Sequence, residues 1–189
     1  MMDCFEAHKV ISQHRGQAVV VATMTSNFEW PHVSKNPGLD LLFSGAMGKA
    51  SSTGLGIALA RPDKKVIVLD GDGSLLMNLG TLVTIVNMAP PNLIYFVFEN
   101  NVYRTTGGQP IPLAGKLNFA ALARDVGFTK VHAYKELEDL KANISKIMRQ
   151  KGPVFVSLEV PPMTERPPYP LVKTSDIIDR FKVALQNST

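Results

Sequence analysis

Polar residues that can hold a metal ion follow two apolar runs of this 189-residue chain. The run at 65–69 (KVIVL) leads into 70–74 (DGDGS), and the run at 93–98 (LIYFVF) leads into 99–101 (ENN). Carboxylate and amide oxygens are ligands that Mg²⁺ and Ca²⁺ prefer, and such ions usually leave positions for a substrate phosphate. The two clusters therefore indicate a site for a hard divalent cation that carries a phosphate.

One helix-length segment separates the two clusters, so they follow consecutive strands of one strand–helix–strand unit. The carboxyl ends of such strands lie at the same edge of a parallel sheet, about 4.8 Å apart, or about 10 Å apart when one strand intervenes. Asp72 and one of the asparagines can then reach one ion. The alternative is that DGDGS is only a turn and that the asparagines belong to a loop, which the pairing of the clusters disfavours.

The glycines of the first cluster suit a bound phosphate. Gly71 and Gly73 allow a tight turn and a close approach of the backbone, and the amides of Gly73 and Ser74 open the next helix, where an anion is favoured. A dinucleotide-binding G-x-G-x-x-G motif fits poorly, because its third glycine would fall at Leu76.

The elements that must position these residues alternate along the chain. Because the strand cores are continuously apolar, we expect a doubly wound, mostly parallel sheet with helices on both faces, in the α/β class. The predicted strands are 18–22, 65–69, 93–98, 130–133 and 154–160. The predicted helices are 5–14, 49–60, 75–86, 119–125 and 136–150.

A Pro-rich stretch at 161–170 is expected to end the compact domain, which we place at 1–160. The remaining residues, 161–189, then form a linker and a last amphipathic helix, capped by Thr174 or Ser175. Its apolar side would dock on the core or on a partner; that side carries Ile177, Ile178, Phe181 and Leu185.

Composition excludes several classes of protein. The residues are 45% hydrophobic and only 19% charged, which argues against a disordered chain, and the net charge of +4 is too scattered for a nucleic-acid surface. A single cysteine, Cys4, excludes an internal disulfide framework and a Cys-rich zinc or iron–sulfur site. With no visible signal peptide or membrane span, we expect a cytoplasmic protein.

The pairing of Gly71-Asp72-Gly73-Ser74 with Asn100-Asn101 resembles the GDG(S)…NN motif of the thiamine diphosphate-dependent enzymes. The resemblance implies that Mg²⁺ is held by Asp72, by an asparagine and by the backbone carbonyl of Tyr103. Asn101 is the asparagine that the family motif favours, with Asn100 as the alternative. Gly71, Gly73 and Ser74 would then contact the cofactor diphosphate.

A second segment, Ser44-Gly45-Ala46-Met47-Gly48, resembles the part of this family that holds the other end of thiamine diphosphate. There the resemblance implies cofactor contacts by Ser44 and Gly45, with a backbone carbonyl of Gly45 on the aminopyrimidine. Met47 would wedge under the bent cofactor. The alternative is that Met47 is an ordinary core residue.

Within the family, the chain is similar to 2-oxoacid decarboxylases of the sulfopyruvate and phosphonopyruvate type. The segments that carry this likeness are 45–52, 70–82 and 100–110. Arg104 stands where a small residue is expected, and it would bind an anionic substrate group or pair at the surface. Thr105 and Thr106 are further candidates for substrate contact, because 103–109 either closes over the substrate or is an ordinary loop.

The activating glutamate of this family lies in a pyrimidine-binding domain, which has no counterpart in the sequence. Of the seven glutamates, Glu99 and Glu29, which is expected in a loop beside Trp30, are taken as solvated or structural. The resemblance therefore implies a hetero-oligomer with a pyrimidine-domain α subunit, acting on a small 2-oxoacid. The alternatives are a subunit of a thiamine-dependent carboligase or oxidoreductase, and a non-catalytic cofactor-binding partner.

Overall fold

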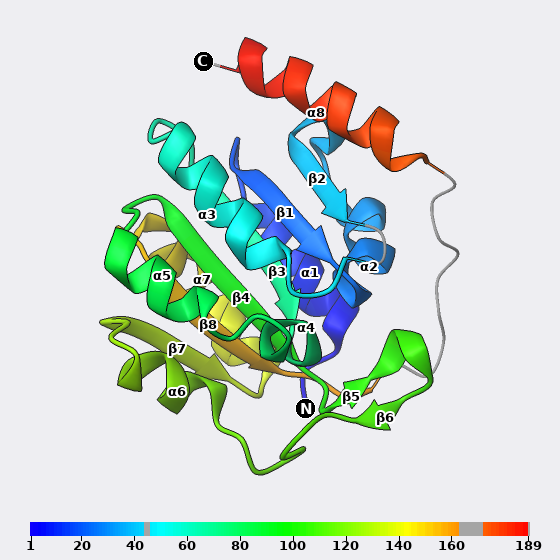
Figure 1. Cartoon of the computed structure of the whole chain (residues 1–189), viewed down its shortest axis with the longest axis vertical. Helices are drawn as coiled ribbons and strands as arrows, with labels where there is room; N and C mark the ends of the chain where they lie inside the picture. The colour runs from blue at the N-terminus through cyan, green and yellow to red at the C-terminus, as the bar shows by residue number, and fades with distance from the viewer. Residues whose placement is uncertain (44–45, 163–171, 189) are drawn as a thin grey trace.

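The computed structural model describes residues 1–43, 46–162 and 172–188. Its centre is a six-stranded parallel sheet in the order β2-β1-β3-β4-β8-β7 (Figure 1). The strands of this sheet are β1 (Val19–Thr23), β2 (Asp40–Phe43), β3 (Val66–Gly71), β4 (Leu93–Glu99), β7 (Lys130–Tyr134) and β8 (Val154–Glu159). A short antiparallel ribbon joins β5 (Val102–Tyr103) to β6 (Gln109–Pro110).

Helices cover both faces of the sheet: α3 and α5 lie on one face, and α1 and α7 lie on the other (Figure 1). The helices before β4 are α1 (Cys4–His14), α2 (Thr25–Val33), η1 (Pro37–Leu39), α3 (Ala50–Ala60), α4 (Asp72–Leu76) and α5 (Thr81–Met88). Those after β4 are η2 (Arg104–Thr106), α6 (Phe119–Asp125), α7 (Leu137–Arg149) and α8 (Thr174–Asn187). The expected doubly wound α/β fold is confirmed.

The central strands form because their side chains are apolar on both faces. Every residue of β4 from Leu93 to Phe98 is buried, as are the first five residues of β3 and of β8. Burial of apolar surface contributes about 25 cal/mol per Å², so strands of this kind are stable only between two helical layers. The most polar buried group of β4, the Tyr95 hydroxyl, donates a hydrogen bond to Asp70 Oδ2 at 2.8 Å.

The strand register brings the two polar clusters to one edge of the sheet. β3 pairs directly with β4, with Asp70 opposite Val97 and Gly71 opposite Phe98. Asp72 and Asn100 therefore emerge close together at the carboxyl ends of neighbouring strands. The structure confirms the expected juxtaposition, with no strand between.

The prediction of one continuous helix at 75–86 is wrong. The structure has two helices, α4 and α5, separated by a turn at 77–80. Asn78 holds this turn, because its side-chain amide donates hydrogen bonds to the Gly48 carbonyl at 2.8 Å and to Ser52 Oγ at 3.0 Å. Gly80 then serves as the N-cap of α5. A tertiary contact to the segment before α3 therefore overrides the helical periodicity.

Two elements near the amino terminus were not predicted. β2 is a four-residue edge strand, and α2 is a nine-residue helix that contains Pro31 in its last turns. The expectation that Glu29 lies in a loop is therefore wrong in that respect: Glu29 is in α2 and is buried. Pro31 makes this helix hard to predict from the sequence, because proline is rarely tolerated in a helix beyond its first turn.

The last helix, α8, docks on the core rather than standing free. Ile177 and Phe181 are buried, and α8 contacts β2 and η1. The Arg61 guanidinium adds a polar tie, since it donates hydrogen bonds to the carbonyls of Leu185 and Ser188. Most of the predicted Pro-rich linker, at 163–171, lies outside the described residues.

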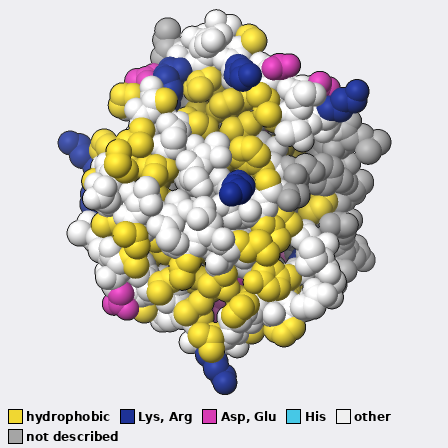
Figure 2. Space-filling view, viewed as in Figure 1, with side chains coloured by type: hydrophobic (Ala, Val, Ile, Leu, Met, Phe, Trp, Pro, Cys, Tyr) yellow, Lys and Arg dark blue, Asp and Glu magenta, His cyan; other side chains and the backbone are white. Residues whose placement is uncertain are grey.

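The face on which α3, α4 and α5 lie carries many exposed apolar side chains (Figure 2). Four large ones on or beside these helices are substantially exposed: Leu59, Met77, Val83 and Met88. Among residues 1–43, 46–162 and 172–188, no helix has the length and apolar character needed to cross a membrane.

Candidate functional site

A pocket at the carboxyl edge of the sheet gathers most of the residues singled out in the sequence. Four turns build its wall: the one after β1, the one before α3, the β3–α4 junction and the segment after β4. The lining residues are Met24, Thr25, Met47, Gly71, Asp72, Gly73, Ser74, Asn100, Val102, Tyr103, Arg104 and Thr105. The structure thus brings the DGDGS cluster, the first asparagine and Met47 together.

Asp72 forms the centre of this arrangement. Its Oδ2 accepts a hydrogen bond from the Asn101 backbone amide at 2.7 Å, and its Oδ1 accepts one from the Gly73 amide at 2.7 Å. Burial raises the pKa of the Asp72 carboxyl, while the backbone donors around it act in the opposite direction. A desolvated carboxylate at a strand end is suited to a cation, because the cation offsets the cost of burying the charge.

The two asparagines near Asp72 line different cavities. Asn100 is buried and lines the pocket, and its Oδ1 accepts a hydrogen bond from the Val102 amide at 3.0 Å. Asn101 has φ 63°, in the left-handed region that asparagine tolerates. Its Oδ1 accepts a hydrogen bond from the Gly115 amide at 2.8 Å, and its side chain lines a neighbouring cavity.

The Tyr103 carbonyl accepts a hydrogen bond from the Gly108 amide at 3.0 Å, which closes the ribbon of β5 and β6. The Tyr103 ring lies against Gly73: a Cβ added at Gly73 would sit 2.6 Å from a ring carbon. At Gly71, by contrast, an added Cβ would meet no atom within 4 Å. Only the second glycine of the motif is therefore required for packing.

Ser74 and Asp70 stabilise the first turn of α4 through hydrogen bonds. Ser74 Oγ accepts a hydrogen bond from the Gly48 amide at 2.9 Å and contacts Asp70. Asp70 is fully buried and also accepts hydrogen bonds from Tyr95 Oη and the Gly71 amide. Burial raises the pKa of Asp70 to about 6. Sequence analysis missed this role of Asp70, although its place at the end of an apolar strand was a signal.

The segment of the second motif is only partly described. Met47 is half-buried and lines the pocket, as a cofactor wedge would require. Ser44 and Gly45, the other two predicted cofactor contacts in this segment, lie outside the described residues.

Met24 and Thr25 line the pocket but were missed in the sequence. They follow β1 at the same sheet edge, so their position after an apolar run was a usable signal. Met24 has φ 52° and ψ −121°, a conformation that costs a residue with a side chain about 1–3 kcal/mol. Such strain is commonly found at ligand sites, which agrees with the position of Met24 in the wall.

The predicted substrate residues do not all reach the pocket. Arg104 and Thr105 line it, whereas Thr106 is exposed and its hydroxyl donates a hydrogen bond to the Tyr103 carbonyl at 3.3 Å. All three lie in η2, between the two strands of a short ribbon. The segment at 103–109 is therefore a folded turn, not an irregular loop.

A polar cavity adjoins the pocket on the far side of Asn101. Glu99, Ser157, Glu159 and Lys135 lie in its wall. Glu99 is half-buried and accepts a hydrogen bond from Ser157 Oγ; burial raises the pKa of its carboxyl to about 7. Its contacts agree with the structural role expected for Glu99.

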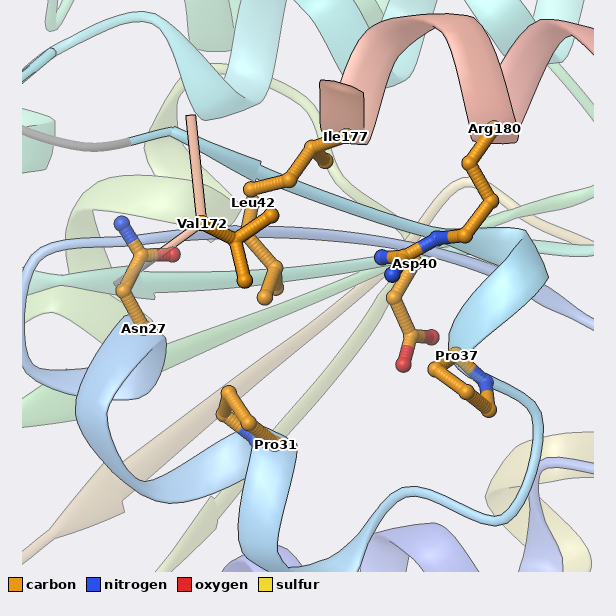
Figure 3. A pocket seen from close by; sticks show the side chains of 8 residues that line it. All are labelled: Asn27, Pro31, Pro37, Asp40, Leu42, Val172, Ile177 and Arg180. Atoms are coloured by element: carbon orange, nitrogen blue, oxygen red, sulfur yellow. The ribbon is translucent and has the colours of Figure 1, made fainter. Parts of the chain in front are cut away.

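A third hollow lies beneath α8, where side chains of α2, η1 and β2 face the helix (Figure 3). Arg180 reaches from α8 toward Asp40, whose carboxylate already pairs with Arg15 at 2.6 Å. The wall is mostly apolar and includes none of the motif residues. The motif residues therefore have no part in this hollow.

Comparisons with known proteins agree with this geometry. A family model described as "Thiamine pyrophosphate enzyme, C-terminal TPP binding domain" matches residues 16–158. The chain is 39% identical over 145 residues to the sulfopyruvate decarboxylase subunit beta of Methanothermobacter thermautotrophicus, covering 77% of this chain and 75% of that subunit. It is 42% identical over 118 residues to the phosphonopyruvate decarboxylase of Streptomyces viridochromogenes, covering 62% of this chain but only 29% of that enzyme.

The fold has a solved counterpart as well. A structure from Mycobacterium smegmatis, described as a thiamin diphosphate-dependent enzyme, superimposes with a TM-score of 0.73 at 20% identity, covering 85% of this chain and 32% of that one. The family model spans most of this chain and includes both motifs that line the pocket. The chain therefore belongs to the thiamine pyrophosphate enzymes, in the family of their C-terminal TPP-binding domain.

Proposed function

We propose that this chain is the diphosphate- and magnesium-binding subunit of a thiamine diphosphate-dependent 2-oxoacid decarboxylase. The observation that carries the proposal is the contact between the Asp72 carboxylate and the Asn101 amide at 2.7 Å, in a pocket that also contains Gly73 and Met47. Relatives named sulfopyruvate decarboxylase subunit beta and phosphonopyruvate decarboxylase support the reaction type.

The donor set at the strand ends fits Mg²⁺. Asp72 supplies a carboxylate, Asn101 or Asn100 an amide oxygen, and Tyr103 a backbone carbonyl, which are the hard oxygen ligands that this ion takes. The burial of Asp72 supports a resident cation for the reason given above. Diphosphate oxygens and water would complete the coordination.

The β3–α4 junction would hold the diphosphate itself. The amides of Gly71 and Gly73 donate hydrogen bonds to Asp70 Oδ1 and Asp72 Oδ1, so the diphosphate would share or replace these bonds, and the Ser74 amide would add a third donor. The contact of Gly73 with Tyr103 keeps the turn close to the proposed metal ligands. Ser74 contributes chiefly by fixing the turn, because its hydroxyl is engaged by the Gly48 amide and by Asp70.

Met47 would support the bent cofactor, with Ser44 and Gly45 completing the contacts on the aminopyrimidine side. When bound, thiamine diphosphate supplies an electron sink for the carbanion that forms when a 2-oxoacid loses CO₂. The share of this chain is then to anchor, orient and shield that cofactor.

The substrate would carry a second anionic group, as sulfopyruvate and phosphonopyruvate do. Arg104 lies in the pocket wall, and a guanidinium can bind a sulfonate, phosphonate or carboxylate through two hydrogen bonds. Thr105 lines the same wall, and Thr106 would act only by supporting the Tyr103 carbonyl.

A pyrimidine-domain partner would complete the site, in a cytoplasmic hetero-oligomer. Several relatives are named subunit beta, which supports a second subunit. The exposed apolar side chains of Leu59, Met77, Val83 and Met88, on or beside α3, α4 and α5, provide a surface suited to such a partner. The activating glutamate would come from that chain.

The test is reconstitution. The chain is mixed with its α subunit, thiamine diphosphate and Mg²⁺, and CO₂ release is measured over a panel of 2-oxoacids. Release confined to substrates with a second anionic group supports the proposal. CO₂ release together with a condensation product in place of the aldehyde would indicate a carboligase. CO₂ release coupled to reduction of an electron acceptor would indicate an oxidoreductase, and binding without turnover would indicate a non-catalytic partner. Each of these three results would contradict the proposed decarboxylase.

A further inference from the structure

Three side chains that can bind a metal meet in the interior between α1 and α2. Cys4 and His8 lie one turn apart on α1, and Glu29 comes from α2. They are only 3%, 0% and 1% exposed. None of them lines the pocket that contains Asp72. The cluster is thus distinct from the proposed cofactor site.

The potential ligand atoms of this cluster converge. His8 Nδ1 lies 2.8 Å from Glu29 Oε2 and 3.8 Å from Cys4 Sγ, and the three ligand atoms all lie within 4.8 Å of one another. In a tetrahedral zinc site the bond lengths put neighbouring ligand atoms about 3.4–3.6 Å apart. Small side-chain adjustments would therefore place all three atoms around one ion.

Hydrogen bonding does not satisfy this cluster. Neither buried carboxylate oxygen of Glu29 accepts a hydrogen bond of good geometry, although His8 Nδ1 lies 2.8 Å from Oε2. His8 Nδ1 also lies 2.8 Å from the Cys4 carbonyl, so a proton on Nδ1 cannot serve that carbonyl and Glu29 equally well. His8 Nε2 lies 3.0 Å from Ser26 Oγ, which can accept a hydrogen bond from the protonated Nε2 of a neutral imidazole. The Nδ1 lone pair would then face the metal, and the Cys4 carbonyl would give up its contact with Nδ1.

We propose that Cys4, His8 and Glu29 together bind one zinc ion that ties α1 to α2. A thiolate, an imidazole and a carboxylate form a ligand set for Zn²⁺ and not for Mg²⁺, which takes oxygen ligands and keeps its waters. The two negative charges of the thiolate and the carboxylate balance the charge of the ion. On binding, the Cys4 thiol releases its proton to solvent and its sulfur bonds to the metal.

The charges around the cluster act in both directions: the Glu29 carboxylate favours a bound cation, whereas the Arg104 guanidinium opposes one. Burial holds the pKa of the Cys4 thiol well above its usual range, and Glu29 acts in the same direction. Arg104 opposes these effects by favouring the thiolate. In the absence of a metal the thiol therefore stays protonated, whereas a zinc ion supplies the charge that a buried thiolate needs.

The zinc ion would also support the cofactor pocket indirectly. α2 begins at Thr25, and both Thr25 and the strained Met24 before it lie in the pocket wall. An ion that joins α1 to α2 fixes the start of α2 relative to the core. Its loss is then expected to lower the thermal stability of the chain first, and its cofactor affinity second.

The experiment measures metal content without any enzymatic activity. The full chain is produced with zinc in the medium and purified without chelator, and zinc is quantified by mass spectrometry and by a chromophoric chelator before and after denaturation. We expect one zinc ion per chain, released only on denaturation because the site is buried. Refolding with Co²⁺ as the probe is expected to give the thiolate-to-cobalt charge-transfer band of a cysteine ligand.

Two variants and one control make the test specific. Cys4→Ser is expected to abolish the cobalt band, and Glu29→Gln to lower the zinc content sharply, while Asp72→Ala keeps the full zinc content because it removes a ligand only from the proposed magnesium site. Circular dichroism checks that each variant is folded.

Two results would overturn the proposal. Folded wild-type chain without zinc and without a cobalt band would show that Glu29 is only a buried counter-ion for His8. Full zinc content in a folded Cys4→Ser variant would remove Cys4 from the ligand set. If both variants fail to fold, the wild-type zinc content and cobalt spectrum still decide the question.

Discussion

The backbone amide of Asn101 donates a hydrogen bond to Asp72 Oδ2 at 2.7 Å, and this contact joins the ends of β3 and β4. The two residues are 29 positions apart in the sequence. The contact fixes the DGDGS turn against the Asn-Asn turn. A change at either turn should therefore affect the binding of metal and cofactor together.

Replacing Asp72 with Ala removes the only carboxylate proposed to bind Mg²⁺. We expect the affinity for thiamine diphosphate in the presence of Mg²⁺ to fall by a factor of about 100 or more, or about 2.8 kcal/mol, measured by calorimetric titration of the assembled complex. Asp63→Ala is the control, because Asp63 is exposed and pairs with Arg61 away from the pocket. Equal affinity in the Asp72 variant and wild type would remove Asp72 from the site.

The two glycines of the motif should differ in their tolerance of a side chain. Gly73→Ala places a Cβ 2.6 Å from the Tyr103 ring, so Tyr103 must shift and the chain should lose about 1–3 kcal/mol of stability. Gly71→Ala meets no atom within 4 Å and has an ordinary φ of −103°, so its stability should stay within about 0.5 kcal/mol of wild type. Chemical denaturation measures both; similar losses would argue against the packing role of Gly73.

Met47 should matter more for turnover than for stability. If it supports the bent cofactor, Met47→Ala lets the reacting atoms drift from the separation of about 3–3.5 Å that reaction needs, and turnover by the assembled complex falls. Thermal unfolding of the same variant should change little, because Met47 is only half-buried. A stability loss of about 2–5 kcal/mol with turnover retained would instead identify Met47 as a core residue.

The exposed face of α5 should bind the partner subunit. Val83, on α5, is 58% exposed, and Val183, on α8, is 57% exposed, which makes the two a matched pair. We expect Val83→Asp to weaken hetero-oligomer formation and Val183→Asp to leave it unchanged, as measured by analytical ultracentrifugation with the α subunit. An effect confined to Val183→Asp would place the partner on α8.

Much of the fold follows from the apolar runs in the sequence. The strands at 66–71, 93–99 and 154–159 consist mainly of β-branched, aromatic and leucine residues, and their order along the chain predicts a parallel sheet. The predictions failed where tertiary contacts decide the local structure. Asn78 breaks a helix by bonding to the Gly48 carbonyl, and no local pattern shows this.

The residues of the candidate site likewise divide into those that the sequence could predict and those that it could not. Asp72 and the asparagines could be predicted because their spacing follows from one strand–helix–strand unit. Met24 and Thr25 follow an apolar run, but only the order of the strands in the sheet places the end of β1 beside the end of β3, so this signal alone did not identify them. The burial of Glu29 beside His8 likewise depends on the packing of α1 against α2, which the sequence does not display.

We expect this chain to hold only one half of a catalytic site, with the other half in its partner. The most direct measurement is CO₂ release from anionic 2-oxoacids, with thiamine diphosphate and Mg²⁺, by the purified chain alone and after addition of its pyrimidine-domain partner. Mass spectrometry must first show that no second protein is present. We expect no release by the chain alone and release once the partner is added. Sustained decarboxylation by the chain alone would contradict the account, because the activating acid would then have to be one of its own seven glutamates.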